Sequence, residues 1–188
     1  VTRIMKECQL LRPVFPWVHV AGTKGKGSTC VFLNNILVEA GYQVGLYISP
    51  HLCDSTERIA IQSIPVKEKE LVPLANQLDS SLNRLGIQDI SFFEYWTLLA
   101  LFVFTAHHID IAIIETGLGG RLDAANAIQN PLLSILTLIG RDHVDRLGSS
   151  PEVIALEKAG VIRQSVPVLS AKQIPEVELI ITKEAQDH

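Results

Sequence analysis

The sequence predicts a doubly wound α/β domain with a mostly parallel sheet, and two observations carry this prediction. Short apolar runs rich in β-branched residues alternate with segments of helical periodicity, the pattern of a sheet covered by helices on both faces. Polar or glycine-rich loops follow these runs, and in such sheets ligands sit at the carboxyl ends of the strands. At 188 residues the chain suits one domain that buries a sizeable core without disulfides or metal.

Hydrophobic periodicity and helix breakers place the individual elements. The runs predicted to be strands are 17–21, 44–48, 109–115, 133–138 and 166–170. Helical spacing covers 2–11, 29–40, 67–85, 92–107 and 151–159, and Pro175 introduces a last helical segment. Alternation over 57–66 around Gln62 and Ser63 predicts a small hairpin. We expect residues 1–16 to form an N-terminal helix and linker, and residues 17–188 to form the domain itself.

Composition excludes several classes of partner. The formal charge is −4 with no basic run, which argues against a nucleic-acid surface. The longest apolar segment, around 96–104, is too short to span a bilayer. Cys8, Cys30 and Cys53 show no metal-type pairing, as expected of reduced thiols in a cytosol-like compartment. We therefore expect a cytoplasmic monomer with no nucleic-acid or membrane partner.

The stretch from Gly22 to Ser28, GTKGKGS, is the most informative motif in the chain. It joins the strand 17–21 to the helix 29–40, so its backbone N–H groups and the helix dipole can bind a phosphate. Lys26 supplies a cation for the terminal phosphates, and Ser28 or Thr29 supplies a hydroxyl for Mg²⁺. The usual phosphate loop has lysine directly before the hydroxyl residue, whereas here Gly27 stands between them. We predict that the loop binds ATP.

Two further polar groups follow predicted strands. Glu115 ends the run 109–115 before a glycine-rich turn, where its carboxylate can bind Mg²⁺ or cap the loop. His143, in the segment Asp142-His143-Val144-Asp145, can reach a metal or a phosphate, or it can be an ordinary hydrogen-bonded histidine. His51 stays undecided between a site residue and an exposed one.

Five ordered blocks of this sequence resemble one known family. They are His19–Thr29, Ser49–Leu52 with Glu57–Ile59, Glu115–Asp123, Asp142–His143 and Glu157–Gly160. Together they resemble folylpolyglutamate synthase and dihydrofolate synthase, the folate branch of the Mur ligase superfamily. The resemblance runs from about His19 to Ser170 and accounts for Gly27, because this branch carries Gly-Lys-Gly-Ser in its phosphate loop.

The resemblance implies an ATP-dependent ligase that adds L-glutamate to a folate or dihydropteroate carboxylate through an acyl phosphate. It also implies a C-terminal domain that these residues do not include, so that the fragment alone ligates poorly. The nucleotide would contact Gly22, Thr23, Lys24, Gly25, Lys26, Gly27, Ser28, Thr29 and Asn126. Lys24 departs from the family pattern, where many bacterial members have Asn.

The resemblance also assigns the metal, substrate and catalytic residues. Ser28 would bind one Mg²⁺, and Ser49, Glu115 and His143 a second. Lys158 matches a lysine that members of the family carbamylate, and it joins the catalytic set Lys26, Glu115, His143 and Lys158. The substrate would contact Asp123 and the loop that carries Ser49, Pro50, His51 and Arg58.

Two alternatives to the folate ligase stay open. The chain can be a nucleotide-binding module without ligase activity, or a peptidoglycan-type Mur ligase. The Gly-Lys-Gly-Ser loop and the Glu-Thr-Gly-Leu-Gly-Gly block favour the folate branch over the second alternative.

Overall fold

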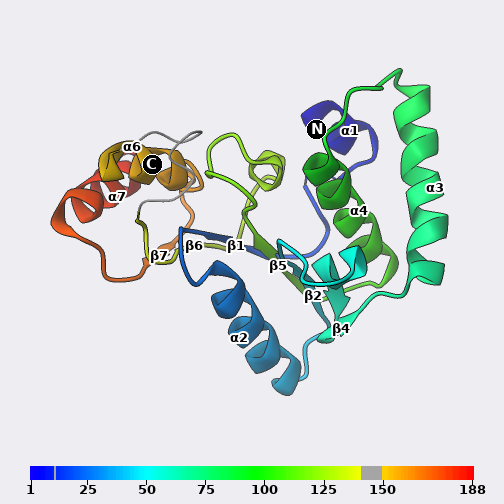
Figure 1. The fold of residues 1–188 in the computed structure, drawn as a ribbon, viewed down its shortest axis with the longest axis horizontal. Coiled ribbons are helices and arrows are strands. Elements are labelled where there is room, and N and C mark those ends of the chain that lie inside the picture. The colour runs from blue at the N-terminus through cyan, green and yellow to red at the C-terminus, as the bar shows by residue number, and fades with distance from the viewer. Residues whose placement is uncertain (11, 141–149) are drawn as a thin grey trace.

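The computed structural model describes residues 1–10, 12–140 and 150–188, and its described strands form one mixed sheet (Figure 1). The strand order is β4-β3-β2-β5-β1-β6-β7. The strands are β1 (Trp17–Ala21), β2 (Val44–Tyr47), β3 (Ile59–Ile61), β4 (Ile64–Pro65), β5 (Ile111–Glu115), β6 (Leu133–Leu136) and β7 (Val168–Ser170). Strands β2, β5, β1, β6 and β7 are parallel to one another, and β3 and β4 add an antiparallel edge. The mostly parallel sheet predicted from the sequence is confirmed.

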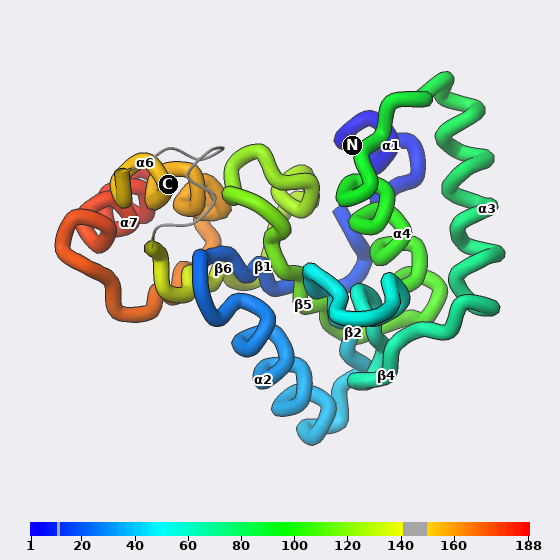
Figure 2. Tube along the Cα trace, in the orientation of Figure 1, coloured from blue at the N-terminus to red at the C-terminus, as the bar shows by residue number. Residues whose placement is uncertain are grey.

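Helices cover both faces of this sheet. They are α1 (Thr2–Glu7), α2 (Lys26–Glu39), α3 (Glu68–Arg84), α4 (Phe92–Ala106), α6 (Pro151–Ala159) and α7 (Pro175–Asp187), with 3-10 turns at Ser55–Arg58 and Ala124–Ala127. The tube view places α2 on one face, α4 on the other with α1 and α3 outside it, and α6 with α7 beyond β6 and β7 (Figure 2). No helix in the described ranges is both long and apolar enough to cross a membrane.

The main core lies between α4 and the sheet. Leu98, Leu101 and Phe104 of α4 are fully buried there, and burying a side chain of this size stabilises the fold by about 1.5–3 kcal/mol. The segment before β1 belongs to the same core, since Met5 is fully buried and Phe15 meets Phe104 edge-on at 6.0 Å. The expected N-terminal helix is present but ends at Glu7.

Helix α2 begins earlier than its periodicity predicts. The sequence favoured a start at Thr29, whereas the helix starts at Lys26. Gly25 is the N-cap with φ of 87°, a left-handed conformation that glycine adopts without steric cost. The first turn of α2 therefore contains Lys26, Gly27 and Ser28 themselves.

The expected hairpin is confirmed, but its first strand begins at Ile59 and not at Glu57. Gln62 and Ser63 form the turn between β3 and β4 with φ of 54° and 66°. Residues Ser55–Arg58 form a 3-10 turn, because Asp54 and Glu57 make a capping box that bonds the backbone locally.

The register of the parallel strands brings their carboxyl ends to one edge. Val20 pairs with Glu115, Tyr47 with Ile114, and Ala21 with Leu136. The loops after β1, β2, β5 and β6 therefore start close together at this edge.

Candidate functional site

The loop after β1, residues 22–25, is fastened to the chain after β6. The backbone N–H groups of Thr23 and Lys24 both donate to the carbonyl oxygen of Leu138, at 2.9 and 3.1 Å. The Thr23 hydroxyl lies 3.1 Å from both the N–H and the carbonyl oxygen of Gly140. Thr23 and Lys24 thus use their amides to hold the loop, and the amides that remain for a ligand are those further on.

The first turn of α2 supplies those amides. Its first helical hydrogen bond runs from Thr29 N–H to Gly25 O, at 2.9 Å. The N–H groups of Lys26, Gly27 and Ser28 precede this bond and have no acceptor within the helix. A Cβ placed on Gly25 would meet no atom of the described residues within 4 Å. The N-terminus of α2 is thus suited to bind an anion.

Glu115 lies directly beside this turn. Its Oε1 is 3.9 Å from the Lys26 Nζ, and its Oε2 accepts a hydrogen bond of 3.1 Å from the Ser49 N–H. A Cβ on Gly27 would lie 3.5 Å from Oε2. The carboxyl group is buried, and burial raises its pKa even though the Ser49 amide and Lys26 lower it. A divalent cation here would favour the ionised form and offset the cost of burial.

A buried histidine of β1, His19, bonds to the residue that follows β5. The His19 Nε2 lies 3.0 Å from the Thr116 hydroxyl. Burial, with the charge of Arg163 as a second cause, lowers the pKa of His19 to about 3. The ring is therefore neutral at physiological pH and its role is structural.

A cleft of about 930 Å³ opens next to this cluster, within the size range of small-molecule sites. Ser49 connects the two, because it lines the cleft while its N–H binds Glu115. The other lining residues are Pro50, Arg58, Ser91, Phe93, Glu94, Gly117, Leu118, Gly119, Gly120, Leu122, Asp123, Ala124, Val153 and Glu157. The wall includes an aromatic ring and several aliphatic groups together with three carboxylates and a guanidinium.

The loop after β2 is organised by two of its own charged residues. Glu57 accepts hydrogen bonds from the N–H groups of Leu52, Cys53 and Asp54, at 2.8–3.0 Å. Arg58 is buried, donates from Nε to His51 Nδ1 at 2.9 Å and stacks over the Phe92 ring at 5.1 Å. The ring nitrogen that His51 uses here must be unprotonated, because it accepts this hydrogen bond.

Asp123 organises the glycine-rich turn after β5. Its Oδ2 accepts from the N–H groups of Gly117 and Leu118, both at 3.0 Å, and its Oδ1 accepts from Ala125 at 2.9 Å. Burial raises the pKa of Asp123 to about 6, against the effect of these three amides. The carboxylate oxygens of Asp123 thus accept most of their hydrogen bonds from protein amides, although the residue also lines the cleft.

Lys158 reaches the phosphate loop from α6. It is buried, and its Nζ donates to the carbonyl oxygen of Gly22 at 2.7 Å. Sequence position gives no sign of this contact, because 136 residues separate the two partners.

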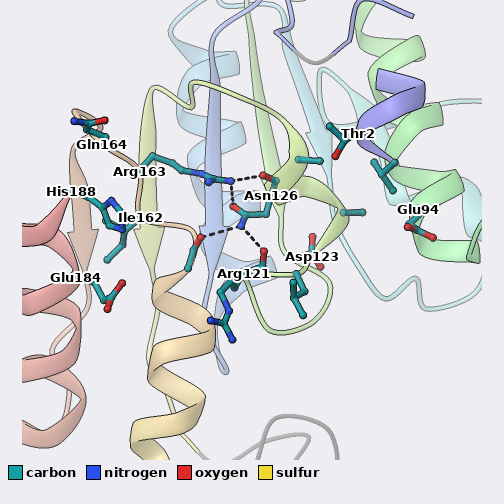
Figure 3. Close-up of a pocket in the computed structure, with 15 residues that line it drawn as sticks. Thr2, Glu94, Arg121, Asp123, Asn126, Ile162, Arg163, Gln164, Glu184 and His188 are labelled. Carbon is teal, nitrogen blue, oxygen red and sulfur yellow. Dashed lines mark hydrogen bonds between the residues drawn. The ribbon is translucent and has the colours of Figure 1, made fainter. Parts of the chain in front are cut away.

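Asn126 lies on the other side of the glycine-rich turn, in a second cavity of about 800 Å³ (Figure 3). Its Nδ2 donates to the carbonyl oxygens of Arg121 and Gly160, at 2.8 and 3.0 Å, and its Oδ1 accepts from Arg163 at 2.7 Å. The expected contact of Asn126 with a nucleotide stays a prediction, since all its polar atoms already bind protein groups.

The structure thus brings Lys26, Glu115, Ser49 and the first turn of α2 together, and Lys158 bonds to Gly22 at the start of the loop. Pro50, Arg58 and Asp123 line the cleft, and His51 joins through Arg58. His143 and Asp142 lie outside the described residues. Within the described ranges no three His, Cys, Asp or Glu side chains form a group able to hold a metal.

Comparison with known proteins places this site in a family. No family model matches the chain. The chain is 42% identical over 174 residues to the dihydrofolate synthase/folylpolyglutamate synthase of Bacillus subtilis, and this match covers 90% of the chain and 40% of that protein. It is 36% identical to a folylpolyglutamate synthase of Arabidopsis thaliana over 90% of the chain and 28% of that protein.

Comparison with solved structures points to the same family. The apo form of L. casei FPGS superimposes with a TM-score of 0.94 at 31% identity, over 98% of the chain and 46% of that structure. An E. coli FolC complex with DHPP and ADP superimposes with a TM-score of 0.91 at 38% identity, over 99% of the chain and 44% of that structure. The chain is a homologue of the N-terminal part of folylpolyglutamate and dihydrofolate synthases.

The chain spans less than half the length of these relatives. The match confirms the fold class and the family resemblance seen in the sequence blocks. Sequence reasoning missed the contacts of Arg121, Glu157 and Arg163 with the glycine-rich turn and its neighbourhood, because these contacts join residues more than thirty positions apart.

Proposed function

We propose that this chain forms the ATP- and substrate-binding part of a ligase that joins L-glutamate to a folate or dihydropteroate carboxylate. The observation that carries the proposal is the position of Ser49 and Glu115. Ser49 lines the 930 Å³ cleft and binds Glu115 through its N–H, while Glu115 lies beside Lys26 at the anion-binding end of α2. A carboxylate bound in the cleft can therefore meet a phosphate bound at α2.

The relatives support this assignment of the two subsites. The E. coli relative was solved with DHPP and ADP, and an FPGS structure was solved with AMPPCP and folate. We assign the nucleotide to the loop 22–25 and the first turn of α2, and the folate-type substrate to the cleft. The aromatic and aliphatic wall of the cleft suits a flat heteroaromatic ring.

The ligase reaction makes one amide bond at the expense of one ATP. The substrate carboxylate attacks the γ-phosphorus and ADP leaves, and the amine of glutamate then displaces phosphate from the acyl group. Such a reaction needs charge neutralisation rather than a nucleophilic side chain. Lys26 and the amides of Lys26, Gly27 and Ser28 hold the phosphate charge, and Ser49 and Glu115 orient the end of the cleft toward it.

The donor set also suits Mg²⁺. Glu115 supplies a buried carboxylate and Ser49 a hydroxyl, both favoured by this ion, and the exposed Ser28 hydroxyl is available to a second ion. We assign His143 to the first of these sites on the family resemblance. When bound, Mg²⁺ neutralises charge on the phosphates and on the reacting carboxylate.

Lys158 is the remaining residue of the proposed catalytic set. We propose that its neutral amine adds CO₂ to form a carbamate, with release of one proton. The carbamate nitrogen keeps one hydrogen, so it can still donate to the Gly22 oxygen that the lysine now contacts at 2.7 Å. The change would turn a cation into an oxygen ligand beside the phosphate loop. We further propose that the protein acts as a cytoplasmic monomer.

The test is a substrate panel on the full-length protein that carries this chain. Dihydropteroate and tetrahydrofolate are each supplied with ATP and L-glutamate, and product is detected by mass spectrometry. We expect ADP and a product one glutamate heavier, only when all substrates are present. Lys26→Ala should lower kcat/KM by about a thousandfold, as loss of a main phosphate contact does. Lys69→Ala on the exposed face of α3 is the matched control. ADP formation that needs neither glutamate nor a folate would refute the ligase assignment.

A further inference from the structure

The glycine-rich turn after β5, residues 117–123, is packed backbone against backbone onto the end of α6. A Cβ on Gly120 would lie 2.7 Å from the carbonyl oxygen of Glu157 and 2.9 Å from that of Lys158. A Cβ on Gly160 would lie 2.4 Å from the Arg121 Cβ. Glycine is required at both positions, since any larger residue would force the two segments apart.

Polar bonds join the same two segments. The Arg121 N–H donates to the carbonyl oxygen of Glu157 at 2.8 Å, and the Arg121 guanidinium forms an ion pair with the Glu157 carboxylate. The Asn126 Nδ2 bridges the carbonyl oxygens of Arg121 and Gly160. Figure 3 shows Arg121 and Asn126 next to each other at the end of α6. Packing and polar bonds together thus join the last turn of α6 to the glycine-rich turn.

The residue that this arrangement holds is Lys158. Glu157 directs its side chain to Arg121, while the next residue, Lys158, directs its side chain to Gly22 in the opposite segment. Two consecutive residues of α6 thus connect the turn after β5 to the phosphate loop after β1. Among the described residues, the Arg121 and Glu157 side chains bind each other, whereas Lys158 bonds to the phosphate loop.

We infer that Arg121 and Glu157 are positioning residues whose ion pair sets the distance of the Lys158 Nζ from the phosphate loop. The inference rests on the catalytic role proposed above for Lys158. The Arg121 side chain is 57% exposed and that of Glu157 19%, and solvent at the exposed arginine weakens what the ion pair adds to overall stability. What the pair contributes is therefore the geometry of α6 rather than the stability of the fold.

The first measurement needs no ligase activity. Full-length wild-type protein and Glu157→Gln are labelled with an amine-acylating reagent in bicarbonate-free buffer, and labelling rates of single lysines are read by mass spectrometry. We expect Lys158 to label several-fold faster in Glu157→Gln, while the exposed Lys183 keeps its rate and the melting temperature is unchanged. Equal Lys158 rates in the two proteins would overturn the inference.

The second measurement is a double-mutant cycle on kcat. Glu157→Gln should lower kcat by about tenfold, the usual size of an effect transmitted through a neighbouring ligand, and should have no further effect in a Lys158→Ala background. The exchanged pair Arg121→Glu with Glu157→Arg should recover much of the loss, and Glu178→Gln on α7 is the control. Multiplicative losses in the double variant would mean that Glu157 acts independently of Lys158.

The two measurements separate this inference from the proposed function. If the wild-type protein ligates no glutamate, the proposed function fails, and the labelling rates still decide whether Glu157 positions Lys158. If the wild type ligates and the cycle is multiplicative, the function stands and the positioning role falls.

Discussion

Gly27 offers a substitution in which the fold and the site should respond in opposite directions. The residue lies in the first turn of α2, where helical backbone angles suit any residue. Of the described residues outside the helix backbone, an added methyl would meet the Glu115 oxygens alone, at 3.5 and 3.9 Å, which are ordinary contact distances. Alanine exceeds glycine in helix propensity by up to about 1 kcal/mol. Gly27→Ala should therefore leave the free energy of unfolding unchanged or raise it by as much as about 1 kcal/mol.

The same methyl would occupy the space between the α2 amides and the Glu115 carboxylate. We place phosphate and Mg²⁺ in this space, so Gly27→Ala should weaken ATP binding at least tenfold, or about 1.4 kcal/mol. Thermal unfolding and a fluorescent-nucleotide displacement titration on the full-length protein measure the two effects separately. ATP affinity equal to that of the wild type would refute the placement of the ligand. A fall of several degrees in melting temperature would refute the unstrained helical geometry at Gly27.

Three more substitutions test other parts of the site. Gly22→Ala should weaken nucleotide binding and lower the free energy of unfolding by at least about 2 kcal/mol. The reason is that the added Cβ would lie 1.9 Å from the Thr137 hydroxyl. Urea unfolding measures the loss of stability, and a midpoint equal to that of the wild type would contradict it. The unfolded state protonates His19 near pH 6.5 and the native state only near pH 3, so stability present above pH 6.5 is lost as pH falls, by about 2 kcal/mol at pH 5. His19→Asn should remove this part of the pH dependence between pH 7 and 5, and an unchanged slope would show that His19 is not its source. Burial raises the pKa of Glu115, so Mg²⁺ binding should release protons and weaken at lower pH; calorimetry in two buffers should detect this in the wild type but not in Glu115→Gln, with Glu178→Gln as control.

The sequence predicted those features whose causes are local. Pro151 and Ser150 mark the start of α6, and its predicted range 151–159 agrees with the helix observed. The turn at Gln62 and Ser63 is also where the spacing placed it. The start of α2 was predicted three residues late, because periodicity does not register a left-handed N-cap such as Gly25.

Contacts between distant segments carry no comparable local signal. The glycines and charges around Glu115 indicated a site, but the sequence could not show that Ser49 bonds to Glu115 or that Lys158 reaches Gly22. Asp123 was expected at the substrate and does line the cleft, but the sequence could not show that its oxygens also hold the amides of the glycine-rich turn. Which of these distant residues become neighbours depends on the order of the strands in the sheet, and that order is established only when the whole sheet assembles.

The bonds from Thr23 and Lys24 to Leu138 have a consequence for the kinetics of nucleotide capture. Because these bonds form when the protein folds, the phosphate loop is already ordered before a nucleotide binds. Less conformational entropy is lost on association than in proteins whose loop orders around its guest. Diffusion and the desolvation of the phosphates and the loop should then determine the association rate constant of the nucleotide.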